Sequence, residues 1–188
     1  MIFLNKYNNP KNIRFEMFKK VFELSLERNH KIFVETGTSR GKIKFFFFRK
    51  YNWKDGMSTI MLAEFAKHVK GKLYTCDISK NNINAAKKFS SNFAEYISYH
   101  VEDSIIFLKN FTTNIDLLYL DSLDGHDPTL ASKHQLNEIK NSMNKMHQNS
   151  LILLDDKGSK TNLSANYLKN NNFVTLFETN YQILLGKQ

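Results

Sequence analysis

From Lys31 onward the chain alternates between short apolar runs and longer stretches in which apolar residues recur at helical spacing. Strands that alternate with helices require crossover connections, which give a mostly parallel sheet with helices on both faces. Helices are expected to begin near Met57, Ser79, Ser104, Pro128 and Lys160. This alternation constrains the fold more than any other feature, and it predicts an α/β, doubly wound architecture.

Seven runs are predicted as strands, and the last two differ from the rest. The runs lie at residues 32–35, 72–76, 96–101, 115–120, 150–154, 173–178 and 181–185. Only Thr179 and Asn180 join the last two runs, and so short a link permits only an antiparallel hairpin. We therefore expect a Rossmann-like, mostly parallel seven-stranded sheet that ends in a C-terminal antiparallel hairpin.

The chain offers no internal boundary at which two domains could be divided. Its 188 residues include only two prolines and seven glycines, and no low-complexity linker interrupts them. Residues 1–188 are therefore expected to form one domain. Within it, residues 1–30 are expected to form an N-terminal helical cover, because apolar residues recur at helical spacing between Asn12 and Asn29.

Residues 42–55 form an insertion that contains four consecutive phenylalanines, Phe45 to Phe48. Four consecutive aromatic side chains cannot all face one way on a strand or a helix, so some should pack on the core while others cover a ligand. We expect a loop that acts as a lid over the ligand site. Plain packing and contact with another subunit or a lipid surface are the alternatives.

Composition limits the environment of the protein. With 41% hydrophobic and 24% charged residues, and no apolar stretch near the ~20 residues that a membrane-spanning helix needs, the chain is expected to stay in water. No secretory signal is recognisable near Met1, and the single cysteine, Cys76, excludes an internal disulfide. These features predict a cytoplasmic protein.

The net charge of +9 raises the question of a nucleic-acid partner, since lysine and arginine neutralise phosphates. The cations are not clustered, because lysines occur along the whole chain and only four residues are arginine. A scattered excess of lysine argues against a nucleic-acid partner.

The exit of the first predicted strand carries the strongest sign of a ligand, because open α/β sheets bind ligands beyond the carboxyl ends of their strands. The segment Glu35-Thr36-Gly37-Thr38 places an acid before a glycine-bearing turn. Gly37 allows the backbone to approach a ligand closely, and Glu35 can accept hydrogen bonds from an amine. The glycine spacing is not that of dinucleotide-binding enzymes, which disfavours a dehydrogenase.

Three later segments extend this candidate site. Ser58 and Thr59 stand at the start of a predicted helix, whose N–H groups favour a carboxylate. Asp77-Ile78 ends the second strand, where a carboxylate can bind both ribose hydroxyls of a nucleoside. Asp103-Ser104 follows the third strand and has the alternative role of capping the next helix.

These residues resemble a known family. Glu35-Thr36-Gly37-Thr38, Asn52-Trp53, Asp55-Gly56 and Ser58-Thr59 are similar to the cofactor loop of class I S-adenosylmethionine-dependent methyltransferases related to macrocin and sugar O-methyltransferases, and the resemblance covers roughly residues 32–185. A parallel sheet closed by one antiparallel hairpin is the arrangement of that class. The resemblance implies S-adenosylmethionine as cofactor, with the adenine amine near Asp103. It implies contacts with Glu35, Thr36, Gly37, Thr38, Ser58, Thr59, Asp77, Ile78, Asp103, Ser104 and Asp121.

Acids also follow the fourth and fifth strands, at Asp121, Asp155 and Asp156. Carboxylates at the exits of adjacent parallel strands should converge, and like charges held that close are costly unless a cation neutralises them. Mg²⁺, or another divalent cation, is the natural candidate. The pattern resembles catechol- and macrocin-type O-methyltransferases, whose ion is held by one acid after the fourth strand and a pair after the fifth. The alternative is a set of polar strand ends without metal.

A hydroxyl acceptor would need a base, and Asp124 and His126 lie a few residues after Asp121. The catechol enzyme that the sequence resembles has lysine at the position of Asp124, so the resemblance does not carry over a catechol substrate. His134 is the weaker alternative for the base. Lys157 and Lys160 are expected either to hold an anionic acceptor or to be solvated.

The function predicted from sequence is Mg²⁺-assisted O-methylation of a small hydroxylated molecule by a methyltransferase. One alternative is a metal-independent methyltransferase that acts on a nitrogen of RNA or protein. Another is a non-catalytic nucleoside-binding module. The identity of the acceptor and the oligomeric state, including a homo-oligomer, are left open by the sequence.

Overall fold

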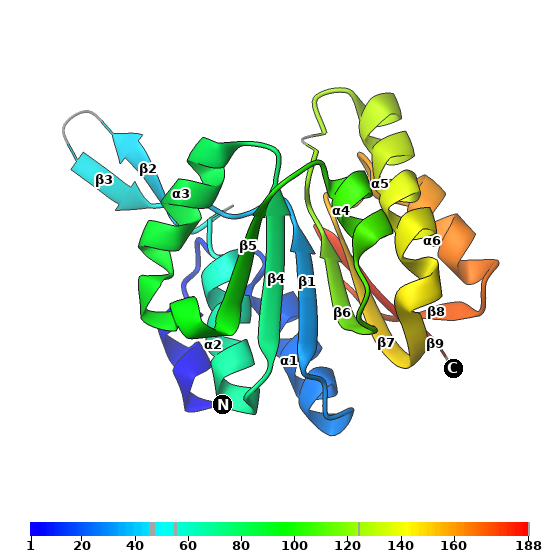
Figure 1. Ribbon diagram of the computed structural model, residues 1–188, viewed down its shortest axis with the longest axis horizontal. Coiled ribbons are helices and arrows are strands. Elements are labelled where there is room, and N and C mark those ends of the chain that lie inside the picture. The colour runs from blue at the N-terminus through cyan, green and yellow to red at the C-terminus, as the bar shows by residue number, and fades with distance from the viewer. Residues whose placement is uncertain (46–47, 55, 124, 188) are drawn as a thin grey trace.

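The computed structural model describes residues 1–45, 48–54, 56–123 and 125–187. In this part of the chain, seven strands form one sheet in the order β5-β4-β1-β6-β7-β9-β8 (Figure 1). The strands are β1 (Ile32–Thr36), β4 (Lys72–Asp77), β5 (Ile97–Val101), β6 (Ile115–Leu120), β7 (Met146–Asp155), β8 (Phe173–Glu178) and β9 (Gln182–Lys187). The first five of these in chain order pair in parallel, whereas β9 pairs antiparallel with both β7 and β8. The predicted fold, including the C-terminal hairpin, is confirmed.

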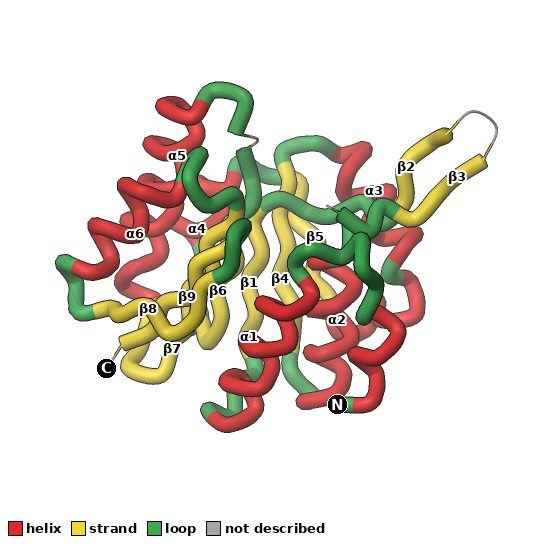
Figure 2. Tube along the Cα trace, turned by 180° about the vertical axis from the view of Figure 1, so that it is seen from behind, coloured by secondary structure: helices red, strands yellow, loops and turns green. Residues whose placement is uncertain are grey.

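Helices cover both faces of the sheet. They are α1 (Phe15–Glu27), α2 (Ser58–Val69), α3 (Lys80–Phe89), α4 (Ser104–Asn110), α5 (Pro128–Ser142) and α6 (Thr161–Lys169), with short 3₁₀ helices η1 (Ile2–Tyr7), η2 (Ser91–Tyr96) and η3 (Met143–Lys145). Helices α1 and α2 lie on one face, in front of the sheet in Figure 2, and α4, α5 and α6 lie on the other. Among the described residues, no helix is both long and apolar enough to cross a membrane.

The sheet separates two apolar cores, because successive side chains of a strand point to opposite faces. In β6, Leu117 and Tyr119 join the core under α1 and α2, while Leu118 and Leu120 join the core under α4 to α6. Helix α1 contributes Phe18 and its neighbours to the first core, so the N-terminal segment packs on the sheet as a helical cover.

Three of the described helices begin where a side chain satisfies free N–H groups of the first turn. Ser79 caps α3, Asp103 caps α4 and Asp127 caps α5 through hydrogen bonds to backbone N–H groups. Pro128 follows Asp127 in the first turn of α5, a position where proline costs no hydrogen bond. These caps place the ends of the preceding connections next to the carboxyl edge of the sheet.

The insertion at residues 42–55 is not the loop that the sequence suggested. It forms an antiparallel hairpin of β2 (Lys42–Phe45) and β3 (Phe48–Tyr51), a separate two-stranded sheet that stands out beside α3 (Figures 1 and 2). The insertion is rich in aromatic residues, which favour extended, paired strands over a loop. Phe46 and Phe47, at the centre of the phenylalanine run, lie outside the described residues.

Candidate functional site

The turn after β1 packs directly on the exit of β6. Gly37 has φ +85°, and its N–H donates to the carbonyl of Cys76 at 2.9 Å. A Cβ atom at Gly37 would lie 2.0 Å from the carbonyl oxygen of Asp121, which is too close for any side chain. The N–H of Asp121 in turn donates to the carbonyl of Thr36 at 2.9 Å. Glycine at position 37 therefore brings the predicted cofactor loop against the predicted metal-binding acids.

Glu35 is a buried carboxylate with one unused oxygen. Its side chain is fully buried, and its Oε2 accepts hydrogen bonds from the hydroxyls of Thr59 and Thr75, both at 2.7 Å. Among the described residues, its Oε1 accepts no hydrogen bond. Burial raises the pKa of Glu35 to about 7, against the opposing effect of the hydroxyl donors. A buried acceptor without a donor is costly, so this atom marks a place for a donor from a ligand.

The start of α2 closes the other side of this loop. Ser39 and Thr59 bond reciprocally, each donating its backbone N–H to the hydroxyl oxygen of the other, at 2.8 and 3.1 Å. Ser58 is the first residue of α2, and Met57 before it makes no side-chain cap. Among the described side chains, that of Ser39 takes only the N–H of Thr59, so the other N–H groups of the first turn remain uncapped. Uncapped N–H groups at a helix start favour a carboxylate ligand. The loop thus offers an acceptor at Glu35 and donors at α2.

The exits of β4 and β5 carry the remaining predicted cofactor residues. Asp77 accepts hydrogen bonds from the N–H of Ser79 at 2.7 Å and from the side chain of Asn82 at 3.0 Å, which fixes its carboxylate at the start of α3. The next residue, Ile78, leaves an apolar side chain 76% exposed. Asp103 caps α4, accepting from the N–H groups of that helix's first turn, so the capping alternative is observed. Capping leaves lone pairs of its carboxylate for a ligand.

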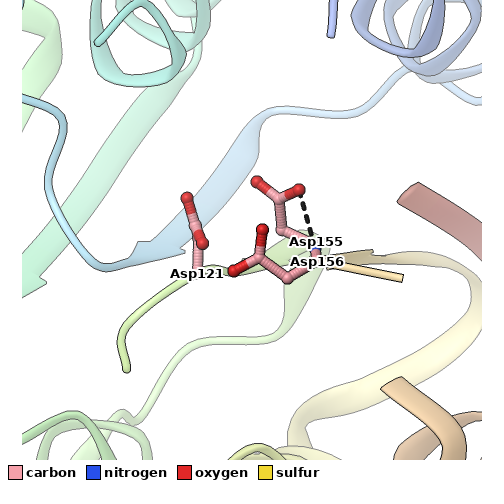
Figure 3. A group of neighbouring side chains, drawn as sticks. All are labelled: Asp121, Asp155 and Asp156. Atoms are coloured by element: carbon pink, nitrogen blue, oxygen red, sulfur yellow. Dashed lines mark hydrogen bonds between the residues drawn. The ribbon is translucent and has the colours of Figure 1, made fainter. Parts of the chain in front are cut away.

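The three acids expected at the exits of β6 and β7 do come together, and we call Asp121, Asp155 and Asp156 the acid cluster. Each offers an oxygen within 4.8 Å of the others (Figure 3). Asp155 is fully buried, and its Oδ1 accepts from the N–H of Asp156 at 2.8 Å, the dashed line in Figure 3. Burial and the neighbouring Asp155 raise the pKa of Asp121 well above its usual range.

Two cations that the sequence analysis did not place here neutralise the acid cluster. Arg14, just before α1, binds Asp155 through Nε at 2.6 Å and reaches Asp156 at 3.5 Å. Lys160, just before α6, lies 3.1 Å from Asp121 and 3.1 Å from Asp156. The Lys160 side chain is only 2% exposed, so of the two alternatives for this residue the solvated one is wrong.

These contacts decide whether the acid cluster fits a metal ion. Asp155 Oδ2, besides Arg14, accepts from the hydroxyl of Tyr119 at 2.5 Å, and the same hydroxyl lies 3.2 Å from Asp121. A divalent cation would have to enter between two fixed positive charges and replace hydrogen bonds that the oxygens already accept. The residues present therefore do not fit Mg²⁺ in this arrangement, although the convergence of the acids was predicted correctly.

The candidate bases lie in the connection between β6 and α5. His126 is exposed there, while Asp124 lies outside the described residues. His134, the alternative, shares a hydrogen bond with the hydroxyl of Ser104 at 2.9 Å, and the carboxylate of Glu138, 3.7 Å from its Nε2, raises its pKa. Lys157, the other cation considered for an anionic acceptor, pairs with Glu178. Of these side chains, His126 is the one in the described connection that is open to an incoming molecule.

Comparisons with known proteins place this arrangement in a family. A family described as "Methyltransferase domain" matches residues 53–157, a segment that runs from the end of the insertion through the acid cluster. No curated protein matches the chain.

Solved structures share the fold at low sequence identity. A Staphylococcus aureus protein described as a caffeoyl-CoA O-methyltransferase has a TM-score of 0.66 and 13% identity, covering 98% of this chain and 95% of that chain. The Podospora anserina methyltransferase PaMTH1, bound to S-adenosylhomocysteine, has a TM-score of 0.64 and 12% identity, with 98% and 87% covered. An rRNA methylase from Streptococcus thermophilus has a TM-score of 0.59 and 12% identity, with 89% and 94% covered.

Proposed function

The chain belongs to the methyltransferase-domain family and is a class I S-adenosylmethionine-dependent methyltransferase, and from this premise we propose that it methylates an oxygen of a small hydroxylated molecule. The observation that carries the cofactor part of the proposal is the unpaired Oε1 of buried Glu35 beside the start of α2, where a side chain takes only the N–H of Thr59. An amino acid end of a ligand, with its ammonium and its carboxylate, matches that pair of partners.

The cofactor contacts follow from the same edge of the sheet. Glu35 would accept from the ammonium, α2 would donate to the carboxylate, and Asp77 would accept from the ribose hydroxyls. Ile78 and Asp103 would border the adenine. When bound, S-adenosylmethionine supplies a methyl group on a positively charged sulfur, so the protein has to orient the acceptor and remove its proton.

We propose His126 as the group that removes this proton. It is exposed in the connection that follows Asp121, at the carboxyl edge of the sheet. His126 would take the hydroxyl proton of the acceptor, whose oxygen would then be free to accept the methyl group that S-adenosylmethionine supplies when bound. Asp124, the second candidate from the sequence, keeps the same proposed role.

We infer that activation of the oxygen does not need Mg²⁺. Arg14 and Lys160 already supply the positive charge that the acid cluster requires, and Lys160 is fixed by three acceptors, which are Asp121, Asp156 and the carbonyl of Leu123. Activity that survives chelation by EDTA supports this form of the proposal. Activity that is lost on chelation and restored by Mg²⁺ would support the metal-assisted form instead.

The methyltransferase assignment is tested by calorimetry with S-adenosylhomocysteine. We expect binding to the wild type, and at least tenfold weaker binding to Glu35→Ala and to Asp77→Asn. The matched control is Glu95→Ala, which removes an exposed carboxylate. Release of S-adenosylhomocysteine is then measured with a panel of hydroxylated acceptors. A folded wild-type protein that does not bind S-adenosylhomocysteine would overturn the proposal.

A further inference from the structure

A second concave site lies outside the acid cluster. An open cavity of about 820 Å³ is bounded by η1, the β2–β3 hairpin, the first turn of α2 and the last turns of α3. The hairpin and α3 stand side by side in both views of the chain (Figures 1 and 2). The volume is that of a site for a small molecule. We call it the hairpin cavity.

Three of the cations that line the hairpin cavity form no ion pair within the described part of the chain. Arg40, Lys42 and Lys88 line it and are exposed, and none of them forms an ion pair with a described residue. No carboxylate is among the described residues that line it. Lys6, which lines the cavity from η1, differs because it pairs with Glu64 at 2.6 Å. Three neighbouring positive charges without counterions attract a ligand that carries more than one negative charge.

Aromatic rings also line the cavity. The ring centroid of Tyr51 lies 5.8 Å from that of Trp53 and 5.9 Å from that of Phe89, and the Lys42 ammonium lies 4.7 Å from the Tyr51 centroid. Such a group of rings offers flat faces on which a planar ligand can stack. Cations and rings are therefore interleaved in one cavity.

The wall that carries these rings is held in place by a close backbone contact. Gly41, at the base of the hairpin, has φ +71°, and a Cβ there would lie 1.9 Å from the ring of Phe89. The carbonyl of Gly41 also accepts from the N–H of Asn52 at 3.0 Å. The base of the hairpin thus packs on Phe89 of α3, which brings the hairpin and α3 together as two walls of the cavity.

We propose that the hairpin cavity binds a nucleotide, with the base on the rings and the phosphate on Arg40, Lys42 and Lys88. An inorganic anion would leave the rings unused, and an uncharged aromatic molecule would leave the cations without partners. A nucleotide satisfies both. The cavity borders the cofactor loop, because Arg40 and Met57 adjoin Ser39 and Ser58 in the chain. The nucleotide is therefore part of the methyl acceptor, an inference that rests on the proposed function.

The source of the nucleotide is either a free mononucleotide or a single-stranded RNA. Both present the same base and phosphate. They differ in the number of phosphates that reach the cations, and hence in how steeply binding weakens with salt. For single strands, the logarithm of the binding constant falls by about 0.7 per neutralised phosphate for each tenfold rise in salt concentration. The experiment below separates these sources.

The test uses Trp53, the only tryptophan of the chain, as a fluorescent reporter inside the cavity. The protein is first saturated with S-adenosylhomocysteine, so that a nucleotide cannot occupy the cofactor site. It is then titrated with uridine monophosphate, with uridine, with inorganic phosphate and with a ten-nucleotide single-stranded RNA. We expect quenching by the monophosphate, and at least tenfold weaker binding of both uridine and phosphate. Tighter, more salt-dependent binding of the oligonucleotide identifies RNA as the source, and equal binding identifies the free nucleotide.

Variants test whether the quenching of Trp53 fluorescence depends on the cations of the hairpin cavity. The double variant Lys42→Ala/Lys88→Ala should bind the nucleotide at least tenfold more weakly while its affinity for S-adenosylhomocysteine, measured by calorimetry, stays unchanged. Lys109→Ala/Lys133→Ala removes two exposed lysines on the opposite side of the sheet and is the matched control. Failure to bind S-adenosylhomocysteine would count against the proposed function alone.

Three results would overturn the inference. The first is absence of quenching by any nucleotide when S-adenosylhomocysteine binds normally. The second is quenching that disappears once S-adenosylhomocysteine is saturating, because the nucleotide would then have occupied the cofactor site. The third is equal binding by the wild type and the Lys42→Ala/Lys88→Ala variant.

Discussion

The acid cluster and the hairpin cavity both contain arginine and lysine, but these cations differ in burial and in whether they pair with carboxylates. At the acid cluster, Arg14 and Lys160 are buried and each binds two carboxylates. At the hairpin cavity, Arg40, Lys42 and Lys88 are exposed and pair with no described carboxylate. Burial of a charge is costly without a partner, whereas an exposed charge keeps its hydration and its freedom to meet a ligand.

The comparison shows why the total charge of +9 says little about function. Cations of the first kind are part of the folded structure and are not available to a substrate. Cations of the second kind are available. Their location, and not their number, carries the functional information.

The largest effect is expected where a buried pair is broken. Arg14→Met leaves the fully buried Asp155 without its guanidinium partner, and the free energy of unfolding should fall by about 3 to 5 kcal/mol. Urea unfolding measures this loss. Lys19→Met, an exposed substitution in α1, is the control and should change stability by less than about 0.5 kcal/mol. A loss of less than about 1 kcal/mol for Arg14→Met would mean that the pair is replaceable by water.

Glu35 lies between these two situations, because its carboxyl group is buried but has no cation as a partner among the described residues. Its pKa is raised from 4.5 to about 7, so the folded state holds the proton more tightly than the unfolded state. This contribution to stability is complete below pH 4.5, is lost as the pH rises from about 4.5 to 7, and is constant above, with a total of roughly 3 kcal/mol.

The measurement is the difference in unfolding free energy between the wild type and Glu35→Gln at several pH values. Glutamine does not titrate, and the contributions of all other titrating groups cancel in the difference. The unfolding free energy of the wild type should therefore fall relative to that of the variant between pH 4.5 and 7. Calorimetry in buffers of different ionisation enthalpy should also detect proton release when S-adenosylmethionine binds near pH 6.5. Parallel stability curves for the two proteins would show that Glu35 is ionised throughout.

Lys160 tests whether the acid cluster can be converted into a metal site. Lys160→Ala removes the cation that Asp121 and Asp156 share, and the remaining carboxylates should then bind a divalent ion. At 100 times its dissociation constant, Mg²⁺ or Mn²⁺ should stabilise the variant by about 2.7 kcal/mol and leave the wild type unchanged. Thermal unfolding with and without the ion measures the difference. Equal stabilisation of both proteins would contradict the assignment of Lys160 as the resident cation.

The sequence revealed these regions to different extents, for physical reasons. The strand exits at Glu35, Asp77 and Asp121 were predictable because each follows a local apolar run, and parallel strands bring their exits to one edge. The Arg14–Asp155 pair was not, because it joins residues 141 positions apart through the docking of α1. The contact of Lys160 with Asp156 could have been predicted from the sequence, since Lys160 stands four residues after Asp156, but its contact with Asp121 could not.

The hairpin cavity could not be read from any motif. Its lining comes from η1, the hairpin, α2 and α3, which only tertiary packing assembles. The phenylalanine run at residues 45–48 does not distinguish a loop from paired strands by periodicity, although the aromatic residues of the insertion favour strands. Local patterns thus predicted the fold and the cofactor edge, while contacts between distant segments decided how the charges are used.

The smallest effect on stability is expected at the hairpin cavity. This is where exposed cations should differ most clearly from the buried cations of the acid cluster. Arg40, Lys42 and Lys88 have no carboxylate partners among the described residues, so replacing any one with alanine removes no ion pair and relieves repulsion between like charges. Each variant should change the free energy of unfolding by no more than about 0.5 kcal/mol, in contrast to Arg14→Met. Urea unfolding of the three variants beside Lys109→Ala measures this. A loss above about 1.5 kcal/mol in any of them would mean that the cation stabilises the hairpin and is not reserved for a ligand.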